Sequence, residues 1–152
     1  MKHAYINGII LDGSKEMEPQ QDKVILTDGE NIEAIVEKAQ IEDKDLTEYE
    51  ITDLAGNYIM PGLINLHLHL PATGKPKKKQ QDPVKLVKLL TSNALLRKLA
   101  LNLCASSAKT QLLSGVTTIR TVGGVLDFDS KIRDQIKAGK LIGPRILSCD
   151  MA

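Results

Sequence analysis

The first sixty residues contain short apolar runs that turn residues interrupt. Alternating apolar and polar positions predict strands, because side chains of a strand point alternately to its two faces. The predicted strands cover residues 4–11, 23–27, 31–36 and 49–54. Asp12-Gly13 and Asp28-Gly29 suit tight turns between antiparallel strands. The charged stretch 37–48 predicts a solvated loop or a short helix. Residues 1–61 are therefore expected to form a small β-sheet or half of a sandwich.

After Pro61-Gly62 the pattern changes to strands that alternate with helical segments. Strands are predicted over residues 63–70, 116–122 and 144–149, the second of them rich in β-branched side chains. Two helical segments separate the three strands. This order predicts a parallel sheet with right-handed crossover connections.

The first helical segment is predicted to begin at Asp82-Pro83, a capping residue followed by proline at the first helical position. Its apolar periodicity continues to Leu113, and Gly115 is placed to end it. A single helix of that length is uncommon, so we expect a break near residues 91–93. A second helix is predicted to follow Asp127 or Asp129 and to end before residue 139.

The strand at residues 63–70 carries His67 and His69, two positions apart. Both imidazoles should project from one face and could converge on one metal ion. Leu63 and Asn65 share that face, whereas the opposite face is an apolar row of Ile64, Leu66, Leu68 and Leu70. We therefore expect ligands on the inner face and helices packed against the outer one. The alternative is a pair of exposed or hydrogen-bonded histidines that bind no metal.

Two imidazoles alone do not complete a metal site, because a catalytic zinc ion takes three or more protein ligands. The remaining histidine, His3, lies in the β-rich N-terminal part. Further ligands would have to be carboxylates, water or residues outside this chain.

Composition excludes several classes of function. With 42% hydrophobic and 26% charged residues, the chain has a normal globular balance. A net charge of +1 gives no field that would select nucleic acid or an anionic membrane, and 3% aromatic residues give no stacking platform for single strands. No apolar run is long enough to span a membrane. Cys104 and Cys149 have no CxxC spacing, which predicts buried free thiols in a reducing, cytoplasmic compartment.

Two stretches carry a family resemblance. Asp53-Leu54-Ala55-Gly56, followed by Ile59-Met60-Pro61-Gly62-Leu63-Ile64-Asn65-Leu66-His67-Leu68-His69-Leu70, resembles the signature of the amidohydrolase superfamily. In that superfamily a small β-sandwich leads through Pro-Gly into the first strand of a metal-bearing (β/α)8 barrel. Residues 113–120 and 137–147 resemble the branch that contains imidazolonepropionase-like proteins and Xaa-Pro or Xaa-Arg dipeptidases.

The resemblance implies an α/β fold in two parts. Residues 1–61 would be the N-terminal part of a composite β-sandwich, and residues 62–152 the first three strands and two helical crossovers of an incomplete TIM barrel. A complete barrel takes about 250 residues. We therefore expect the chain to be the N-terminal portion of a longer enzyme and to be inactive alone.

The activity implied is hydrolysis of amide, cyclic amide or dipeptide C–N bonds by a metal-activated water, with His67 and His69 as ligands of a divalent ion. Zinc is the expected metal, with one or two ions in the whole enzyme. The family's further ligands and its proton-shuttling aspartate match no position here, so no catalytic residue is assigned. The expected partners are a small amide or dipeptide substrate and further copies of the chain, without nucleic acid or membrane.

Two positions depart from the family pattern. Asn65 and Thr121 stand where many members carry aspartate. Asn65 keeps the capacity to support a ligand by hydrogen bonding, whereas Thr121 has no explanation from the sequence. Arg120, Gly123 and Gly124 are further candidates for supporting the site or lining a substrate loop.

A basic loop follows the histidine strand, containing Lys75, Lys77, Lys78 and Lys79. It is either a solvated loop or a clamp for an acidic substrate group. Two other kinds of function stay open for the whole chain: a non-catalytic fragment that associates with itself, and a metal-binding scaffold unrelated to hydrolysis.

Overall fold

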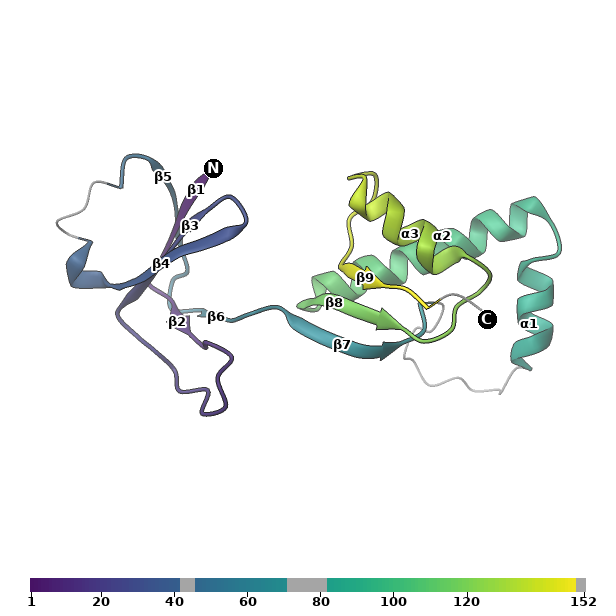
Figure 1. Cartoon of the computed structure of the whole chain (residues 1–152), viewed down its shortest axis with the longest axis horizontal. Helices are drawn as coiled ribbons and strands as arrows, with labels where there is room; N and C mark the ends of the chain where they lie inside the picture. The colour runs from purple at the N-terminus through teal and green to yellow at the C-terminus, as the bar shows by residue number, and fades with distance from the viewer. Residues whose placement is uncertain (42–45, 71–81, 150–152) are drawn as a thin grey trace. The chain divides into compact units, whose positions relative to one another are not determined.

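The chain divides into two compact units, Met1–Pro61 and Gly62–Ala152. The computed structural model, drawn in Figure 1, describes residues 1–41, 46–70 and 82–149. The lysines of the basic loop, Lys75, Lys77, Lys78 and Lys79, lie outside the described residues.

The N-terminal unit is built on a four-stranded sheet in the order β4-β3-β1-β5. Its strands are β1 Lys2–Ile6, β3 Lys23–Asp28, β4 Asn31–Glu37 and β5 Tyr49–Asp53, and a short 3-10 helix, η1, spans Lys38–Gln40. Strand β3 is antiparallel to β1 and β4, while β5 runs parallel to β1. The turn predicted at Asp28-Gly29 joins β3 to β4, with Gly29 at a φ of 57°.

The strand predicted over residues 4–11 is wrong as a single element. Strand β1 ends at Ile6, and β2, Ile9–Ile10, pairs in parallel with β6, Tyr58–Ile59, in a second sheet. Asn7 separates the two with a φ of 54°, a left-handed conformation that asparagine tolerates better than most residues. Asp12-Gly13 likewise lies in a longer loop, which returns to pair Gln20 with Ile10.

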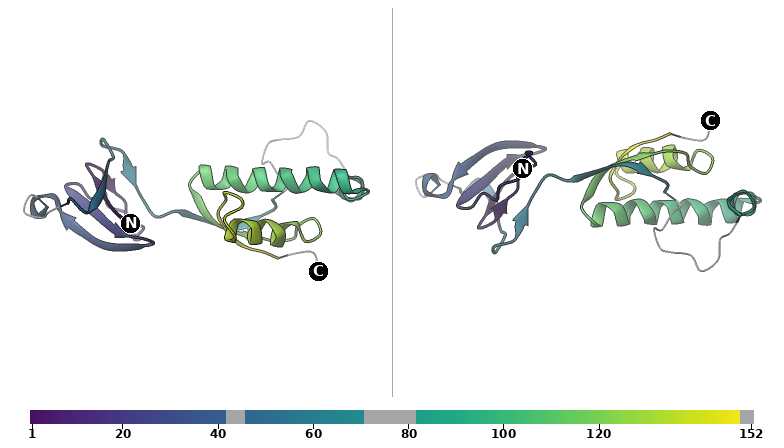
Figure 2. Two further views of the ribbon diagram at one scale, coloured as in Figure 1. Left: turned by 90° about the horizontal axis from the view of Figure 1, so that it is seen from above. Right: turned by 90° about the horizontal axis from the view of Figure 1, so that it is seen from below.

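The C-terminal unit contains a parallel sheet in the order β7-β8-β9. The strands are β7 Leu63–Leu68, β8 Val116–Thr121 and β9 Arg145–Leu147, and the helices are α1 Pro83–Leu90, α2 Ala94–Leu113 and α3 Phe128–Lys137. Helices α2 and α3 run side by side over one face of this sheet (Figure 2). The predicted mixed α/β class, with parallel strands that alternate with helices, is confirmed for these residues.

The helix boundaries follow from capping side chains. The Asp82 carboxylate accepts a hydrogen bond from the Val84 amide at 2.9 Å, and the Asn93 side chain accepts one from the Leu96 amide at 2.9 Å. Asn93 thus starts α2 directly after the predicted break at residues 91–93. Helix α2 ends before Gly115, which has a φ of 90°. Asp127 occupies the N-cap position of α3, but its side chain pairs with Lys131 and makes no capping hydrogen bond.

A buried core lies between the helices and the sheet of the C-terminal unit. It comprises Leu70, Ala100, Cys104, Ala108, Ile119, Val125, Phe128, Ile132 and Ile146. The expectation that the whole outer face of the histidine strand is covered is wrong. Ile64 and Leu66 are 64% and 62% exposed, and only Leu68 and Leu70 contact the core. The physical reason is that β7 is an edge strand, while α2 and α3 pack over β8 and β9.

The two units differ strongly in charge. Met1–Pro61 has 14 acidic and 5 basic side chains, a formal charge of −9, whereas Gly62–Ala152 has 5 acidic and 15 basic ones, a charge of +10. The net charge of +1 for the whole chain is therefore the sum of two large charges of opposite sign. Among the described residues, no helix has the length and apolarity that crossing a bilayer requires.

Candidate metal site

The two histidines of the predicted site lie side by side at the carboxyl end of β7. Their ring centroids are 5.4 Å apart, with the ring planes at 74°. The neighbouring Leu68 and Leu70 contact the core beneath the helices, so the imidazoles project from the other face of the sheet. Both rings are exposed. The shared face expected from their spacing is what the structure shows.

A hydrogen bond orients the imidazole of His69. Its Nδ1 lies 2.9 Å from the carbonyl oxygen of Gly123, in the segment after β8. A carbonyl oxygen only accepts, so Nδ1 must carry the proton and donate it. In the neutral ring this leaves the Nε2 lone pair free for a metal ion, an arrangement common among metal-binding histidines.

An extra residue in β7 shapes the backbone next to His67. The pairing of β7 with β8 shifts between Asn65↔Ile119 and Leu68↔Thr121, so three steps on β7 match two on β8. Such a bulge leaves backbone groups without ladder partners. Here the Asn65 side chain accepts from the His67 amide at 3.1 Å, and Arg120 Nε donates to the Leu66 carbonyl at 3.0 Å.

These bonds give Asn65 and Arg120 a definite place in the structure. Both side chains stabilise the bulged backbone that carries His67. Asn65 needs only its amide oxygen for this contact. An uncharged asparagine can therefore replace the aspartate of the family pattern noted in the sequence analysis.

Gly123 and Gly124 form the turn after β8. Gly123 has a φ of 87°, which glycine adopts without strain. A Cβ on Gly124 would lie 2.7 Å from Cγ of Asp129, a fully buried residue in the first turn of α3. Glycine at position 124 therefore leaves room for the Asp129 carboxylate.

Thr121, which the sequence left unexplained, is fully buried at the end of β8. Its Oγ1 accepts a hydrogen bond from the Cys149 amide at 3.2 Å, and the Gly123 amide donates to the Cys149 carbonyl at 3.2 Å. Sequence reasoning missed Cys149 as a neighbour of the site. The available signal was its position at the end of the third predicted strand, because the carboxyl ends of parallel strands share one edge.

The donor set fits a divalent metal ion only in part. Imidazole nitrogen suits zinc and similar ions, and the two rings are close together. Within residues 1–41, 46–70 and 82–149, no group of three or more His, Cys, Asp or Glu side chains could hold a metal. His3 lies in the N-terminal unit, with its Nδ1 3.5 Å from Glu50. If a metal ion bound here, His67 and His69 would supply two ligands of an incomplete set.

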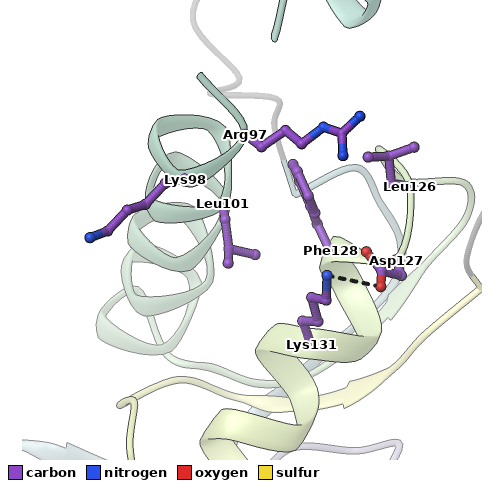
Figure 3. A pocket seen from close by; sticks show the side chains of 7 residues that line it. All are labelled: Arg97, Lys98, Leu101, Leu126, Asp127, Phe128 and Lys131. Atoms are coloured by element: carbon purple, nitrogen blue, oxygen red, sulfur yellow. Dashed lines mark ion pairs between the residues drawn. The ribbon is translucent and has the colours of Figure 1, made fainter. Parts of the chain in front are cut away.

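A cavity of about 660 Å³ lies between α2 and the start of α3 (Figure 3). It is lined by Arg97, Lys98, Leu101, Leu126, Asp127, Phe128 and Lys131. The Lys131 ammonium lies 3.0 Å from the Asp127 carboxylate and lowers the pKa of that group. Neither histidine lines this cavity, so it is separate from the candidate metal site.

No protein-family model matches the chain, and no curated protein matches it either. Solved structures do match over nearly the whole chain, among them the following three. A Bifidobacterium longum protein assigned as a prolidase is 31% identical, with a TM-score of 0.69 over 97% of this chain and 30% of its own. A Xaa-Pro dipeptidase with bound methionine is 25% identical, with a TM-score of 0.72 over 98% of this chain and 33% of its own. A structure described as an amidohydrolase has 24% identity and a TM-score of 0.75, over 100% of this chain and 32% of its own.

These similar structures are described as a prolidase, a Xaa-Pro dipeptidase and an amidohydrolase. More specifically, the resemblance to the amidohydrolase superfamily is confirmed. This chain spans about a third of the length of the matched enzymes, as an N-terminal portion would.

Proposed function

We propose that this chain is the N-terminal portion of a metal-dependent amidohydrolase that cleaves amide, cyclic amide or dipeptide C–N bonds, and that the chain alone is inactive. The observation that carries the proposal is the pair of adjacent imidazoles, one of them oriented by the Gly123 carbonyl. The similarity to a prolidase-type protein and to a Xaa-Pro dipeptidase supports small amides or dipeptides as substrates.

The proposal includes the barrel architecture. Three parallel strands with α2 and α3 over one face support it, because a (β/α)8 barrel is built from parallel strands that alternate with helices. In such barrels the active site lies at the carboxyl ends of the strands. The histidine pair, Gly123 and Cys149 all lie at that end of their strands.

In the proposed site, His67 and His69 would hold a divalent ion, most simply zinc. When bound, such an ion acts as a Lewis acid that polarises an amide carbonyl and brings the pKa of water toward neutrality. The chain's own contribution is positional. Asn65 and Arg120 hold the bulged backbone beside His67, and Gly123 holds the ring of His69.

Zinc binding to the isolated chain tests the site. Competition with a chromogenic chelator is expected to show one zinc ion per chain. His67→Ala and His69→Ala should each lower the affinity by at least about tenfold, because each removes a ligand. His3→Ala is the matched control and should change nothing. Equal loss in all three variants, or unchanged affinity in the His67 and His69 variants, would contradict the assignment.

An activity assay tests the proposal that the chain alone is inactive. Dipeptides and N-acyl amino acids incubated with the zinc-loaded chain are expected to remain intact, because no third His, Cys, Asp or Glu of the described residues groups with the two histidines to complete a metal site. Rapid hydrolysis that His69→Ala abolishes would show that the chain is active alone.

A second candidate function, self-association without catalysis, is favoured by a separate observation. Leu95, Leu99 and Leu103 follow one another at successive turns of α2 and are 78%, 52% and 55% exposed. A contiguous exposed apolar surface favours contact with another molecule. We call Leu95, Leu99 and Leu103 the leucine stripe. In this proposal two copies of the chain associate through it.

A further inference from the structure

The hydrogen bonds around Gly123 connect the ends of all three strands of the C-terminal sheet. Thr121 Oγ1 accepts from the Cys149 amide at 3.2 Å, and the Cys149 carbonyl accepts from the Gly123 amide at 3.2 Å. The Gly123 carbonyl then lies 2.9 Å from Nδ1 of His69. A continuous path of three bonds therefore runs from a fully buried hydroxyl on β8 to an exposed imidazole after β7.

We propose that Thr121 is a positioning residue for His69: its hydroxyl holds the backbone of Cys149, which anchors Gly123 so that the Gly123 carbonyl keeps His69 protonated on Nδ1 and free on Nε2. This inference rests on the proposed metal site for its functional meaning. Its structural content, the proton position on His69, can be measured without any metal.

The backbone of Gly123 needs a hydrogen bond to hold it in place, because glycine itself restricts the backbone very little. It has no side chain, its φ is 87°, and nothing lies within 4 Å of the place where a Cβ would stand. The regular ladder between β8 and β9 ends at Arg120↔Leu147. Beyond that point the Thr121 hydroxyl and the Gly123 amide take over the pairing with Cys149.

The residue type at position 121 suits this role. The side chain is completely buried, and burying a charged group without compensation is costly. A hydroxyl provides the one acceptor that the Cys149 amide requires and adds no charge. Threonine thus keeps the hydrogen-bonding function that an aspartate could serve at this position.

The test uses the whole chain without metal and reads the tautomer of each histidine from long-range 1H–15N spectra. Spectra are taken at about pH 9, above the usual titration range of imidazole. The wild-type protein should show His69 protonated on Nδ1. Thr121→Val keeps the shape but removes the acceptor, so the His69 signal should move toward the Nε2-protonated form. Thr121→Ser keeps the hydroxyl and should restore the wild-type spectrum.

Ile119→Val is the matched control, since it removes packing two residues away on the same buried face but no hydrogen bond. It should leave the His69 tautomer unchanged. An unchanged tautomer in folded Thr121→Val, or an equal change in Ile119→Val, would overturn the proposal. If Thr121→Val does not fold, amide hydrogen exchange of the wild-type protein decides: fast, loop-like exchange at both Gly123 and Cys149 would overturn it.

Zinc affinity separates this inference from the proposed function. Thr121→Val should bind zinc about tenfold more weakly than wild type, and Thr121→Ser about as well as wild type. If the wild-type chain binds no zinc but the tautomer results hold, the metal site fails and the positioning role of Thr121 stands. If Thr121→Val and Thr121→Ser both bind zinc as tightly as wild type, the positioning role fails and the metal site stands.

Discussion

At the scale of single residues, the two cysteines occupy opposite environments. Cys104 is buried among the core residues of α2, whereas Cys149 is exposed after β9. This corrects the expectation that both thiols are buried. The difference arises because Cys104 faces the sheet with Ala100 and Ala108, while Cys149 uses its backbone, not its side chain, to join Thr121 and Gly123.

Thiol chemistry should distinguish the two cysteines. In the folded protein at pH 8, a disulfide reagent such as Ellman's is expected to modify one thiol rapidly and the second only after unfolding. Cys149→Ser should remove the fast reaction, and Cys104→Ala should leave it. Two fast thiols in the wild-type protein would contradict the burial of Cys104.

Cys104 also makes stability depend on pH. Burial, with a smaller contribution from the Asp129 carboxylate, raises the pKa of Cys104 from 9.0 to about 11. A thiol whose pKa is raised on folding stabilises the folded state below its unfolded pKa, and that contribution disappears as pH rises through the folded value. The free energy of unfolding should therefore fall between about pH 9 and 11.

Urea denaturation at pH 8, 9.5 and 11 measures this effect. Other groups titrate in the same range, so the informative quantity is the difference between wild type and Cys104→Ala. The variant should lose less stability over this interval than the wild type, because it has no thiol to ionise. Cys149→Ser, which removes an exposed thiol, should follow the wild-type curve. A wild-type curve parallel to that of Cys104→Ala would show that Cys104 ionises normally.

At the scale of elements, the start of α2 depends on one side chain. Asn93 accepts a hydrogen bond from the Leu96 amide at 2.9 Å, which satisfies one of the free amides of the first turn. Asn93→Ala is expected to lower the free energy of unfolding by about 1 kcal/mol. The control is Asn102→Ala, in the exposed middle of α2, which should be neutral or slightly stabilising because alanine favours helix. Equal effects of the two substitutions in urea denaturation would exclude a capping role.

The elements that local chemistry determines were predictable from the sequence. Asp82, Asn93 and Gly115 mark helix ends by capping or by a positive φ, and these boundaries are confirmed. The division of the first strand at Asn7 was signalled by the Asn7-Gly8 pair, which favours a turn, but the predicted strand followed the apolar residues on both sides of that pair. Which sheet Ile9 and Ile10 join depends on their distant partner, β6.

The candidate site was predictable only where periodicity determines it. Alternation along one strand places His67 and His69 on the same face, and the structure shows them together. The contacts that orient them join different strands: Thr121 meets Cys149, 28 positions later, and Arg120 meets Leu66 across a bulge. Such contacts depend on strand register, which the sequence of a single strand does not reveal.

At the scale of the whole molecule, the leucine stripe should drive association of the chain. Sedimentation velocity over a range of concentrations is expected to show monomers that convert to dimers. Leu95→Lys combined with Leu99→Lys should abolish the dimer, because it places charges on the apolar contact. Ser106→Lys, which adds a charge at an exposed polar position of α2, should leave the dimer intact. A monomer at every concentration would count against the self-association proposal.

Salt should report which surfaces meet in such a dimer. Helices α1 and α2 carry only cationic charges, at Lys85, Lys88, Arg97, Lys98 and Lys109. If two copies associate through their leucine stripes, like charges approach one another and added salt should strengthen the dimer by screening them. Weaker association at high salt would instead indicate contact with an acidic surface, such as the N-terminal unit of another copy.

The parallel pairing of β7 with β8 has a consequence for how the chain is made. Leu63 pairs with Val116, 53 residues later. At a ribosomal rate of about 5 to 20 residues per second, roughly 3 to 10 s pass between the synthesis of β7 and the synthesis of its partner strand β8. During that interval the nascent chain presents an unpaired apolar strand, so productive folding competes with aggregation and should benefit from chaperones that bind extended hydrophobic segments.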